Sequence, residues 1–304
     1  MSDTSDNGAR TRPDPATEAF VAHRRLLFTV AYQLLGSAAD AEDVLQETWL
    51  KWSEVDLATV ENRRAYLVRI ATRQALMQLR TLGRRKESYV GPWLPEPLLT
   101  APDVAEDVAL ADSVSMSMML VLETLGSLER AVFVLREVFA LDYDEIAEAV
   151  GRSADAVRQI ARRARTHVAA RRPRGIVSAA ENRAALGAFQ RAVQTGDLQG
   201  LFDILAPDVV ALNDGGGIRH AAVRPVVGAG KVVRLYASGI AKVGADLVFE
   251  PVDINGGPAL LLRLDGEIDG IVTMRVEDGL VTGLYYVRNP EKLTRVDKAI
   301  TMAR

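Results

Sequence analysis

The stretch from Leu125 to Arg172 constrains the fold of this 304-residue chain more than any other. Apolar side chains recur at helical spacing from Tyr143 to Val150, Gly151 supplies a turn, and Ser153 can cap a second helix. In that second helix, apolar residues at three- and four-residue steps form one stripe that faces the preceding helices: Val157, Ile160, Ala161, Ala164 and Val168. The pattern is typical of a helix-turn-helix.

The other face of this second helix is strongly basic. Between Gly151 and Gly175 there are eight arginines and one acidic residue, Asp155, for a net charge of +7. Arginine suits bidentate contacts with phosphates and guanine edges, so this many like charges favour an anionic partner. A basic helix alone is as easily explained by a solvated helix in an ordinary helical domain. The turn, the cap and the stripe together favour DNA binding.

Composition narrows the class of protein. The net charge is only −3, from 37 basic and 40 acidic residues, so nucleic acid must be bound through local patches. The absence of cysteine excludes disulfides and thiolate metal sites and fits a cytoplasmic location. No run is long enough to cross a bilayer, and the polar N-terminus does not resemble a signal peptide. We expect a multidomain cytoplasmic protein without a metal or cofactor.

We expect four helices between residues 17 and 85. Within this part of the chain, acidic and basic residues are segregated along residues 37–86. Residues 37–61 contain seven acidic residues and one basic residue, Lys51, whereas residues 62–86 contain eight basic residues and no acidic one. Neighbouring helices of opposite charge suit two different partners meeting on one domain. Mutual neutralisation of the two helices is the simpler interpretation and, from charge alone, equally good.

Two motifs make a family resemblance specific. LGSAADAEDVLQETWLKW at 35–52 and RRAYLVRIATRQALMQLR at 63–80 resemble region 2 of the extracytoplasmic-function sigma factors of bacterial RNA polymerase, and the helix-turn-helix resembles region 4. The resemblance implies two all-α domains, core RNA polymerase and promoter DNA as partners, and no membrane partner. Leu45 and Trp49 are expected in the core.

The resemblance also implies a role for each charged surface. The polar positions of the first motif would bind polymerase: Asp40, Glu42, Asp43, Gln46, Glu47, Thr48 and Lys51. The following basic helix would bind and melt the minus-ten element: Arg63, Arg64, Tyr66, Arg69, Arg73, Gln74 and Arg80. The recognition helix would read the minus-thirty-five element: Arg158, Gln159, Arg162, Arg163 and Arg165.

The C-terminal half has a different character. Residues 178–194, 198–205 and 231–242 are predicted helices, and β-branched runs separated by glycine-containing turns predict strands at 209–212, 247–254, 259–264, 270–279 and 280–288. Helices followed by a bent antiparallel meander indicate an α+β cone with a cavity. This half is similar to the SnoaL-like branch of the fold shared with ketosteroid isomerase and nuclear transport factor two. We expect each half to have its own apolar core.

Three short motifs resemble the signature of the SigJ-like group of sigma factors, which carry a fused SnoaL-like domain. They are WLPEP at 93–97, NDGGG at 213–217 and NPEKL at 289–293, with Trp93, Pro95, Asp214, Gly215, Gly216, Gly217, Asn289, Pro290, Lys292 and Leu293 as the residues of interest. The resemblance implies that the fused domain modulates the sigma factor in place of an anti-sigma factor. The linker motif and the C-terminal tail would be its contact points. For the linker, where Pro92, Pro95, Pro97 and Pro102 exclude helix, composition leaves a plain tether equally open.

The expected organisation has five parts. They are a disordered N-terminus at 1–16, region 2 at 17–88, a proline-rich linker at 89–111, region 4 at 112–174 and a SnoaL-like regulatory domain at 175–304.

Two alternatives differ in function class. One is a one-component helix-turn-helix regulator with a ligand-sensing cone, and a small ligand of unidentified chemistry is left open in either case. The other is an enzyme of the SnoaL type, for which Asp208, Asp214, His220, Asp265 and Asp269 are the candidate acids and bases. Asp214 is better explained by its glycine-rich turn, and a shared fold does not carry over chemistry. We expect no catalytic site.

Overall fold

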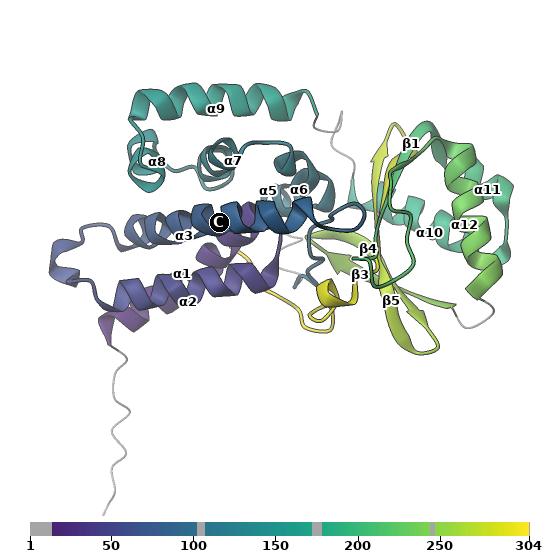
Figure 1. Cartoon of the computed structure of the whole chain (residues 1–304), viewed down its shortest axis with the longest axis horizontal. Coiled ribbons are helices and arrows are strands. Elements are labelled where there is room, and N and C mark those ends of the chain that lie inside the picture. The colour runs from purple at the N-terminus through teal and green to yellow at the C-terminus, as the bar shows by residue number, and fades with distance from the viewer. Residues whose placement is uncertain (1–13, 102–106, 172–177, 244–246, 304) are drawn as a thin grey trace, which may run out of the picture.

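A computed structural model describes residues 14–101, 107–171, 178–243 and 247–303, with only the backbone described for 240–243. An elongated molecule results, with a helical half and a half built on one curved sheet (Figure 1). The predicted N-terminal segment lies almost wholly outside the described residues. None of the described helices combines the length and apolar composition that crossing a bilayer requires.

The first helical domain is a bundle of three long helices. Its elements are α1 (Pro15–Leu35), α2 (Ala38–Ser53), the 3-10 helix η1 (Leu57–Thr59) and α3 (Arg63–Glu87). Gly36 ends α1 at a φ of 71°, and the Ser37 side chain caps α2, so the two helices are joined by a sharp turn. The prediction of four helices was wrong by one, because residues 57–59 form only a single 3-10 turn after the Asp56 cap.

The second helical domain contains the predicted helix-turn-helix. Its elements are α5 (Val108–Val114), α6 (Met116–Glu123), α7 (Ser127–Phe133), the π-helical turn η2 (Val134–Val138), α8 (Tyr143–Val150) and α9 (Ala154–Ala169). Gly151 ends α8 with a φ of 66°, a conformation that glycine adopts without strain, and Ser153 caps α9. The predicted stripe of α9 is buried, which confirms this motif.

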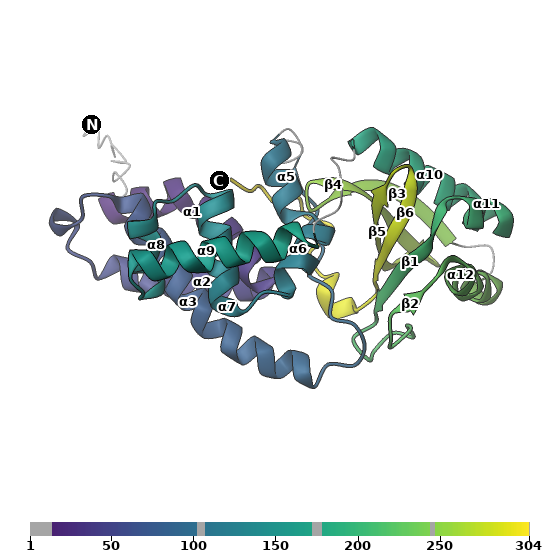
Figure 2. The ribbon, with the colours of Figure 1, turned by 90° about the horizontal axis from the view of Figure 1, so that it is seen from above.

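The C-terminal half is a curved six-stranded sheet with helices against its concave face (Figures 1 and 2). Its elements are α10 (Ala179–Thr195), α11 (Leu198–Asp203), β1 (Leu205–Asp214), β2 (Val226–Val227), α12 (Ala229–Val243), β3 (Leu247–Ile254), β4 (Gly257–Leu264), β5 (Glu267–Glu277) and β6 (Leu280–Val287). A further 3-10 turn, η3 (Pro290–Lys292), follows the last strand. The α+β cone fold is confirmed.

Sheet order departs from a simple meander. The order is β2-β1-β6-β5-β4-β3, and β1 pairs with β6 in parallel, so the expectation of a wholly antiparallel sheet was wrong. The helix α12 and the edge strand β2 lie between β1 and β3 in the chain, and the last strand, β6, returns to pair with β1. The remaining strands form hairpins whose tight turns are closed by Asn255, Asp265 and Asp278, each at a positive φ and followed by glycine.

Three apolar clusters stabilise the molecule. The first is shared by both helical domains and includes Met302 from the C-terminal tail, and the second fills the concave side of the cone. The third joins the halves, because Leu94 of the linker and Met116 of α6 pack against the convex face of the sheet. The expectation that each half is packed on its own core therefore holds only for the cone interior.

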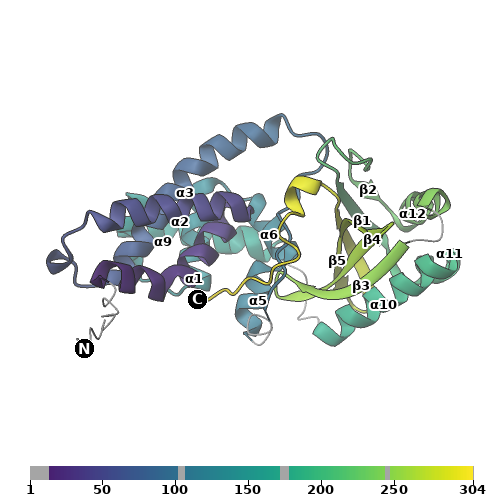
Figure 3. The same ribbon diagram turned by 90° about the horizontal axis from the view of Figure 1, so that it is seen from below.

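The linker between the helical domains is buried rather than a free tether. Residues 94–98 are all buried, between the first helical domain and the sheet. The C-terminal tail returns along the same junction, where Ile300 pairs with Thr100 in a parallel bridge and Met302 enters the core of the helical half (Figure 3). Linker and tail thus hold the cone against the helical half.

Candidate functional site

The predicted polymerase-binding face of α2 is largely open. Four of its members are exposed: Asp43, Gln46, Glu47 and Lys51. Asp40 and Glu42 are partly covered, because Arg85 of α3 lies 2.7 Å from Asp40 and Arg24 of α1 lies 2.7 Å from Glu42. One ion pair therefore joins the acidic and basic helices, and most of the acidic surface stays accessible.

Thr48 does not belong to this face. Its side chain is fully buried, and its hydroxyl donates a hydrogen bond of 2.7 Å to the Val44 carbonyl of the same helix. Leu45 is buried as predicted, while Trp49 is half-buried with its ring centroid 5.3 Å from that of Phe20. Thr48 is a core residue of α2 and offers no atom to a partner.

The basic helix α3 presents only part of the predicted minus-ten set. Arg63, Arg73 and Arg80 are exposed, and Arg64 and Arg69 are half-buried. Tyr66 is half-buried too, with the Arg69 guanidinium 4.2 Å from its ring centroid. Gln74 was wrongly predicted to contact bases, since it is only 6% exposed and lies on the buried side of the helix.

Helix α8 of the helix-turn-helix covers the middle of α3. The Arg69 guanidinium lies 2.9 Å from the Glu148 carboxylate, and Arg73 donates hydrogen bonds to the backbone carbonyls of Glu148, at 2.7 Å, and Ala149, at 3.4 Å. Arg130 of α7 is buried and donates to the Leu34 carbonyl of α1 at 2.7 Å. The two helical domains are thus closed on each other.

The recognition helix α9 projects its basic face outward. All five predicted residues are exposed, namely Arg158, Gln159, Arg162, Arg163 and Arg165. Arg158 pairs with Asp155 on the same helix, and Arg165 lies 3.2 Å from Glu137. Gln159, Arg162 and Arg163 line an open hollow of about 430 Å³. Such a row of cations on a capped helix suits a DNA groove.

The three signature motifs meet around one buried carboxylate, that of Asp214 at the end of β1. It accepts hydrogen bonds from the Tyr89 hydroxyl and from the backbone N–H of Leu94 at 2.9 Å, and it pairs with the Lys292 ammonium at 2.7 Å. Asp214 is therefore a junction between linker, cone and tail. The explanation of Asp214 by its local turn was incomplete, because only its bond with Gly216 is local.

Lys292 is buried among aromatic rings. Its ammonium donates to the Leu94 carbonyl at 2.6 Å and lies 3.5 Å from the centroid of the Trp93 ring and 4.8 Å from that of Tyr89. Burial lowers the pKa of Lys292 to about 8, although the neighbouring Asp214 carboxylate opposes this shift. The cation is held by one carboxylate and two π faces.

Close packing explains the three glycines of this junction. A Cβ on Gly216 would lie 2.4 Å from the Asn289 amide nitrogen, and one on Gly215 would lie 2.2 Å from the Arg219 carbonyl. Gly217 has a φ of 73° and lies against Val90. Pro290 begins η3, Leu293 joins the third apolar cluster, and Pro95 is buried. A side chain at 216 would displace Asn289 of the tail, and one at 215 would displace Arg219 of the same loop.

A second polar junction was missed in the sequence. Asn255, in the β3–β4 turn, is 1% exposed and donates to the Tyr32 hydroxyl of α1 at 2.6 Å and to the Val114 carbonyl at 2.9 Å, while its own amide oxygen accepts from Leu98 N–H at 2.9 Å. Tyr32 in turn donates to the Glu96 carbonyl at 2.7 Å. Burial raises the pKa values of Tyr32 and of the Glu96 carboxyl above their ordinary ranges.

The Glu96 side chain binds the start of α2. Its carboxylate accepts a hydrogen bond of 2.7 Å from the Ala38 backbone N–H, and its own N–H donates to the Gly36 carbonyl at 2.8 Å. A carboxylate at the N-terminus of a helix is stabilised by unpaired N–H groups and the helix dipole. The linker is thereby attached to the same helix that carries the predicted polymerase-binding face.

The candidate catalytic residues of the cone do not form one site. Asp208, Asp265 and His220 are exposed, and Asp265 lies in a hairpin turn. Asp269 is buried, pairs with Arg288 at 2.6 Å and accepts from the Tyr286 hydroxyl. Each acid is therefore at the surface or already bound to a cation.

Comparisons with known proteins cover nearly the whole chain. Residues 19–85 match the family model of sigma-70 region 2, and residues 115–168 match that of sigma-70 region 4. The ECF RNA polymerase sigma factor SigJ of Mycobacterium tuberculosis is 37% identical over 290 residues, which cover 90% of this chain and 92% of SigJ. The probable ECF sigma factor SigI of the same organism is 31% identical, with coverages of 92% and 95%.

A solved structure extends the similarity to the three-dimensional fold. The crystal structure of M. tuberculosis SigJ superposes on this chain with a TM-score of 0.75 and 34% sequence identity. The superposition covers 92% of this chain and 98% of the SigJ chain, so it includes the cone as well as both helical domains.

Proposed function

The chain belongs to the extracytoplasmic-function sigma factors, which direct RNA polymerase to promoters, and from this premise we propose how its surfaces share that task. The exposed residues of α2 bind core polymerase. The open arginines of α3 hold the minus-ten element, and the basic face of α9 reads the minus-thirty-five element. Melting is then a population shift, produced because α3 binds the displaced strand better than the duplex.

We further propose that the cone modulates this activity by keeping the sigma domains closed. The main support for this proposal is the burial of residues 94–98 between the first helical domain and the cone. Asn255 and Asp214 bind this linker from the cone side, and the Asn255 turn also contacts the end of α5. While the junction holds, α8 stays against α3 and engages Arg69 and Arg73. Full promoter contact requires these two arginines to be released.

The closure can be tested with two dyes. The chain has no cysteine, so single cysteines introduced at the exposed Thr81 of α3 and Thr166 of α9 will be labelled specifically. We expect high energy transfer in the free protein and lower transfer after core polymerase is added. Weakening the junction with Asn255→Gly, which tolerates the left-handed backbone, should lower transfer without polymerase. Identical transfer in all three samples would refute the proposal.

A small polar ligand in the cone is a second candidate trigger. Two buried polar atoms on its concave side, the Tyr236 hydroxyl and the Asn213 amide nitrogen, have no hydrogen-bond partner within the described residues. Asn213 lies opposite Tyr286 in the sheet register, beside the Asp269–Arg288 pair. Buried polar groups are normally satisfied, so these atoms favour an additional partner. Native mass spectrometry of protein purified from its source tests this; a ligand-free spectrum from active protein would exclude it.

A further inference from the structure

The loop between β1 and α12, together with α12 itself, is a basic segment that the sigma activity does not account for. From Gly215 to Ala245 the sequence contains five lysines and arginines and no acidic residue. Four of these cations have described side chains, and all four are exposed: Arg219, Arg224, Lys231 and Arg234. Within the described part of the chain, none of the four forms an ion pair with a carboxylate.

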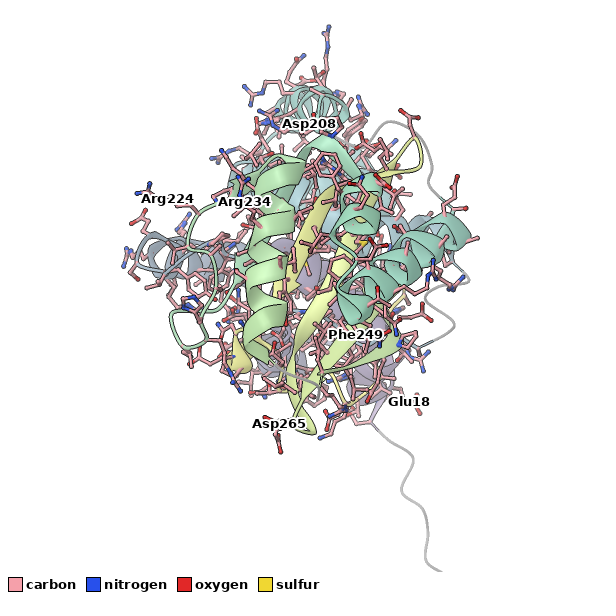
Figure 4. All side chains as sticks on the ribbon, turned by 90° about the vertical axis from the view of Figure 1, so that its right-hand side faces the viewer. Glu18, Asp208, Arg224, Arg234, Phe249 and Asp265 are labelled. Carbon is pink, nitrogen blue, oxygen red and sulfur yellow. The ribbon has the colours of Figure 1, made fainter. Side chains whose placement is uncertain are left out.

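This loop is fixed against the C-terminal end of α3. Gly91, just after α3, approaches the loop so closely that a Cβ there would lie 3.6 Å from the Val223 Cα. Gly217 of the loop lies against Val90, and Arg288, just after β6, donates to the His220 carbonyl at 2.6 Å. In Figure 2 the end of α3 and this loop lie on the same side of the molecule, at the bottom of the view. In Figure 4 this side is on the left, where Arg224 and Arg234 are labelled.

The basic surface of α3 continues into this loop. Arg80 and Arg84 are exposed and four residues apart, so they lie on one face of the last turns of α3. The cations of the cone follow where the helix ends. The contact of residues 90 and 91 with the loop brings together two segments more than 130 residues apart in the sequence, and we name their exposed arginines the α3–cone surface (Arg80, Arg84, Arg219, Arg224 and Arg234).

An extended polyanion fits this surface best. Its cations are spread over a helix end, a loop and a second helix, instead of converging on one point as they would around a small anion. Guanidinium groups supply all five positions, and they bind phosphate in bidentate geometry. The surface also begins on the helix that holds promoter DNA. Exposed Ile218 and Val223 in the same loop would instead suit an acidic protein surface, which is the competing outcome of the test below.

We infer that Arg219, Arg224 and Arg234 of the cone bind the phosphate backbone of promoter DNA adjoining the part held by α3. This inference rests on the proposed contact of α3 with the minus-ten element. It gives the fused domain a direct part in promoter binding, in addition to its hold on the linker. Because phosphates carry no sequence information, the contact adds affinity without adding base specificity.

The test uses holoenzyme assembled from core polymerase and the full-length chain. The variant Arg219→Gln/Arg224→Gln is compared with Arg183→Gln/Arg191→Gln, which removes two exposed arginines from α10. Binding of a labelled promoter fragment is measured from low to high salt. Losing two phosphate contacts should reduce the slope of log affinity against log salt by about 2. The loss should be the same for promoters with altered minus-ten bases, and the α10 control should match the wild type.

A third variant distinguishes a failure of the proposed role of α3 from a failure of the inference about the cone. Arg63→Gln/Arg80→Gln changes α3 alone, so wild-type promoter binding by this variant would refute the proposed role of α3 itself. If the α3 variant is weakened while the loop variant keeps the wild-type salt slope, only the inference about the cone is overturned. It is also overturned if the loop variant binds core polymerase less well but binds promoter normally once assembled, because the partner is then an acidic protein surface.

Discussion

The Asn255 side-chain amide donates a hydrogen bond of 2.6 Å to the Tyr32 hydroxyl, joining the β3–β4 turn of the cone to the last turn of α1. Both side chains are almost completely removed from solvent. Buried polar groups are costly unless paired, so each residue depends on the other half of the molecule for its partner. This bond, rather than apolar contact alone, specifies where the cone sits on the helical domain.

Tyr32→Phe should therefore destabilise the closed arrangement. The substitution leaves the Glu96 carbonyl without its donor and removes one acceptor of Asn255. The expected loss is about 1–3 kcal/mol in the free energy of unfolding. Tyr66→Phe is the matched control, since no hydrogen bond of the Tyr66 hydroxyl occurs among the described residues. Denaturant unfolding measures both, and equal losses for the two variants would contradict the role given to Tyr32.

Glu148→Gln should release Arg69 with little effect on stability. The Glu148 side chain is 68% exposed, and exposed ion pairs contribute about 0.2–1 kcal/mol. Because Arg73 bonds to backbone carbonyls, those contacts persist in the variant. We expect promoter binding by the free protein to tighten by at most about fivefold, and binding by holoenzyme to stay unchanged. The control Asp144→Asn removes the same charge from the same helix, and an equal gain there would indicate a general charge effect.

Helix ends and hairpin turns could be predicted from the sequence, because they depend on the residues at the turn itself. The C-terminal end of α8 and the start of α9 follow from Gly151 and Ser153, whose roles need only neighbouring backbone groups. The hairpins of the cone likewise follow from Asp-Gly and Asn-Gly pairs. The parallel pairing of β1 with β6 could not be predicted in this way, because it depends on the return of a distant strand.

The residues that join the halves were the hardest to predict. Asn255 looks like an ordinary turn residue, and its partner Tyr32 looks like an ordinary core residue of α1. Only the fold brings them together. Thr48 and Gln74 were misplaced for a related reason, because both are polar residues on the buried side of a helix. The Thr48 hydroxyl donates its hydrogen bond within its own helix. The spacing of polar residues in the sequence does not distinguish such a buried threonine from an exposed one.

Substitutions in α9 should affect promoter recognition alone. Arg158→Ala or Arg162→Ala should weaken binding to the minus-thirty-five element by about 1–3 kcal/mol per lost base contact. Core binding should not change, because α9 lies apart from the open face of α2 (Figure 1). Arg171→Ala, just beyond the helix, is the control. Competition between promoters with intact and altered minus-thirty-five sequences measures the effect, and a parallel loss of core affinity would contradict this division.

Substitutions in α2 should instead affect binding to core polymerase. Asp43→Asn/Glu47→Gln removes two exposed acids and should slow association with core polymerase by about tenfold at low salt, since such charges act mainly on the encounter rate. The difference should shrink at high salt. Glu54→Gln/Glu61→Gln removes two acids beyond α2 and should behave like the wild type. An unchanged association rate in the α2 variant would show that polymerase binds elsewhere.

The Asp214–Lys292 pair should make stability depend on pH in a defined window. Burial lowers the pKa of Lys292 from 10.5 to about 8, so between these values the unfolded chain binds more protons than the folded one. Stability from this group therefore rises as pH increases from about 8 to about 10.5, by up to about 3 kcal/mol, and it is lost as pH falls through 8.

Lys292→Met alone would leave the Asp214 carboxylate buried and unpaired, at a cost of about 3–5 kcal/mol. The informative variant is therefore Asp214→Asn/Lys292→Met, which removes both charges. Denaturant unfolding at several pH values should show the alkaline rise in the wild type and not in the double variant, and parallel curves would mean that Lys292 titrates outside this window.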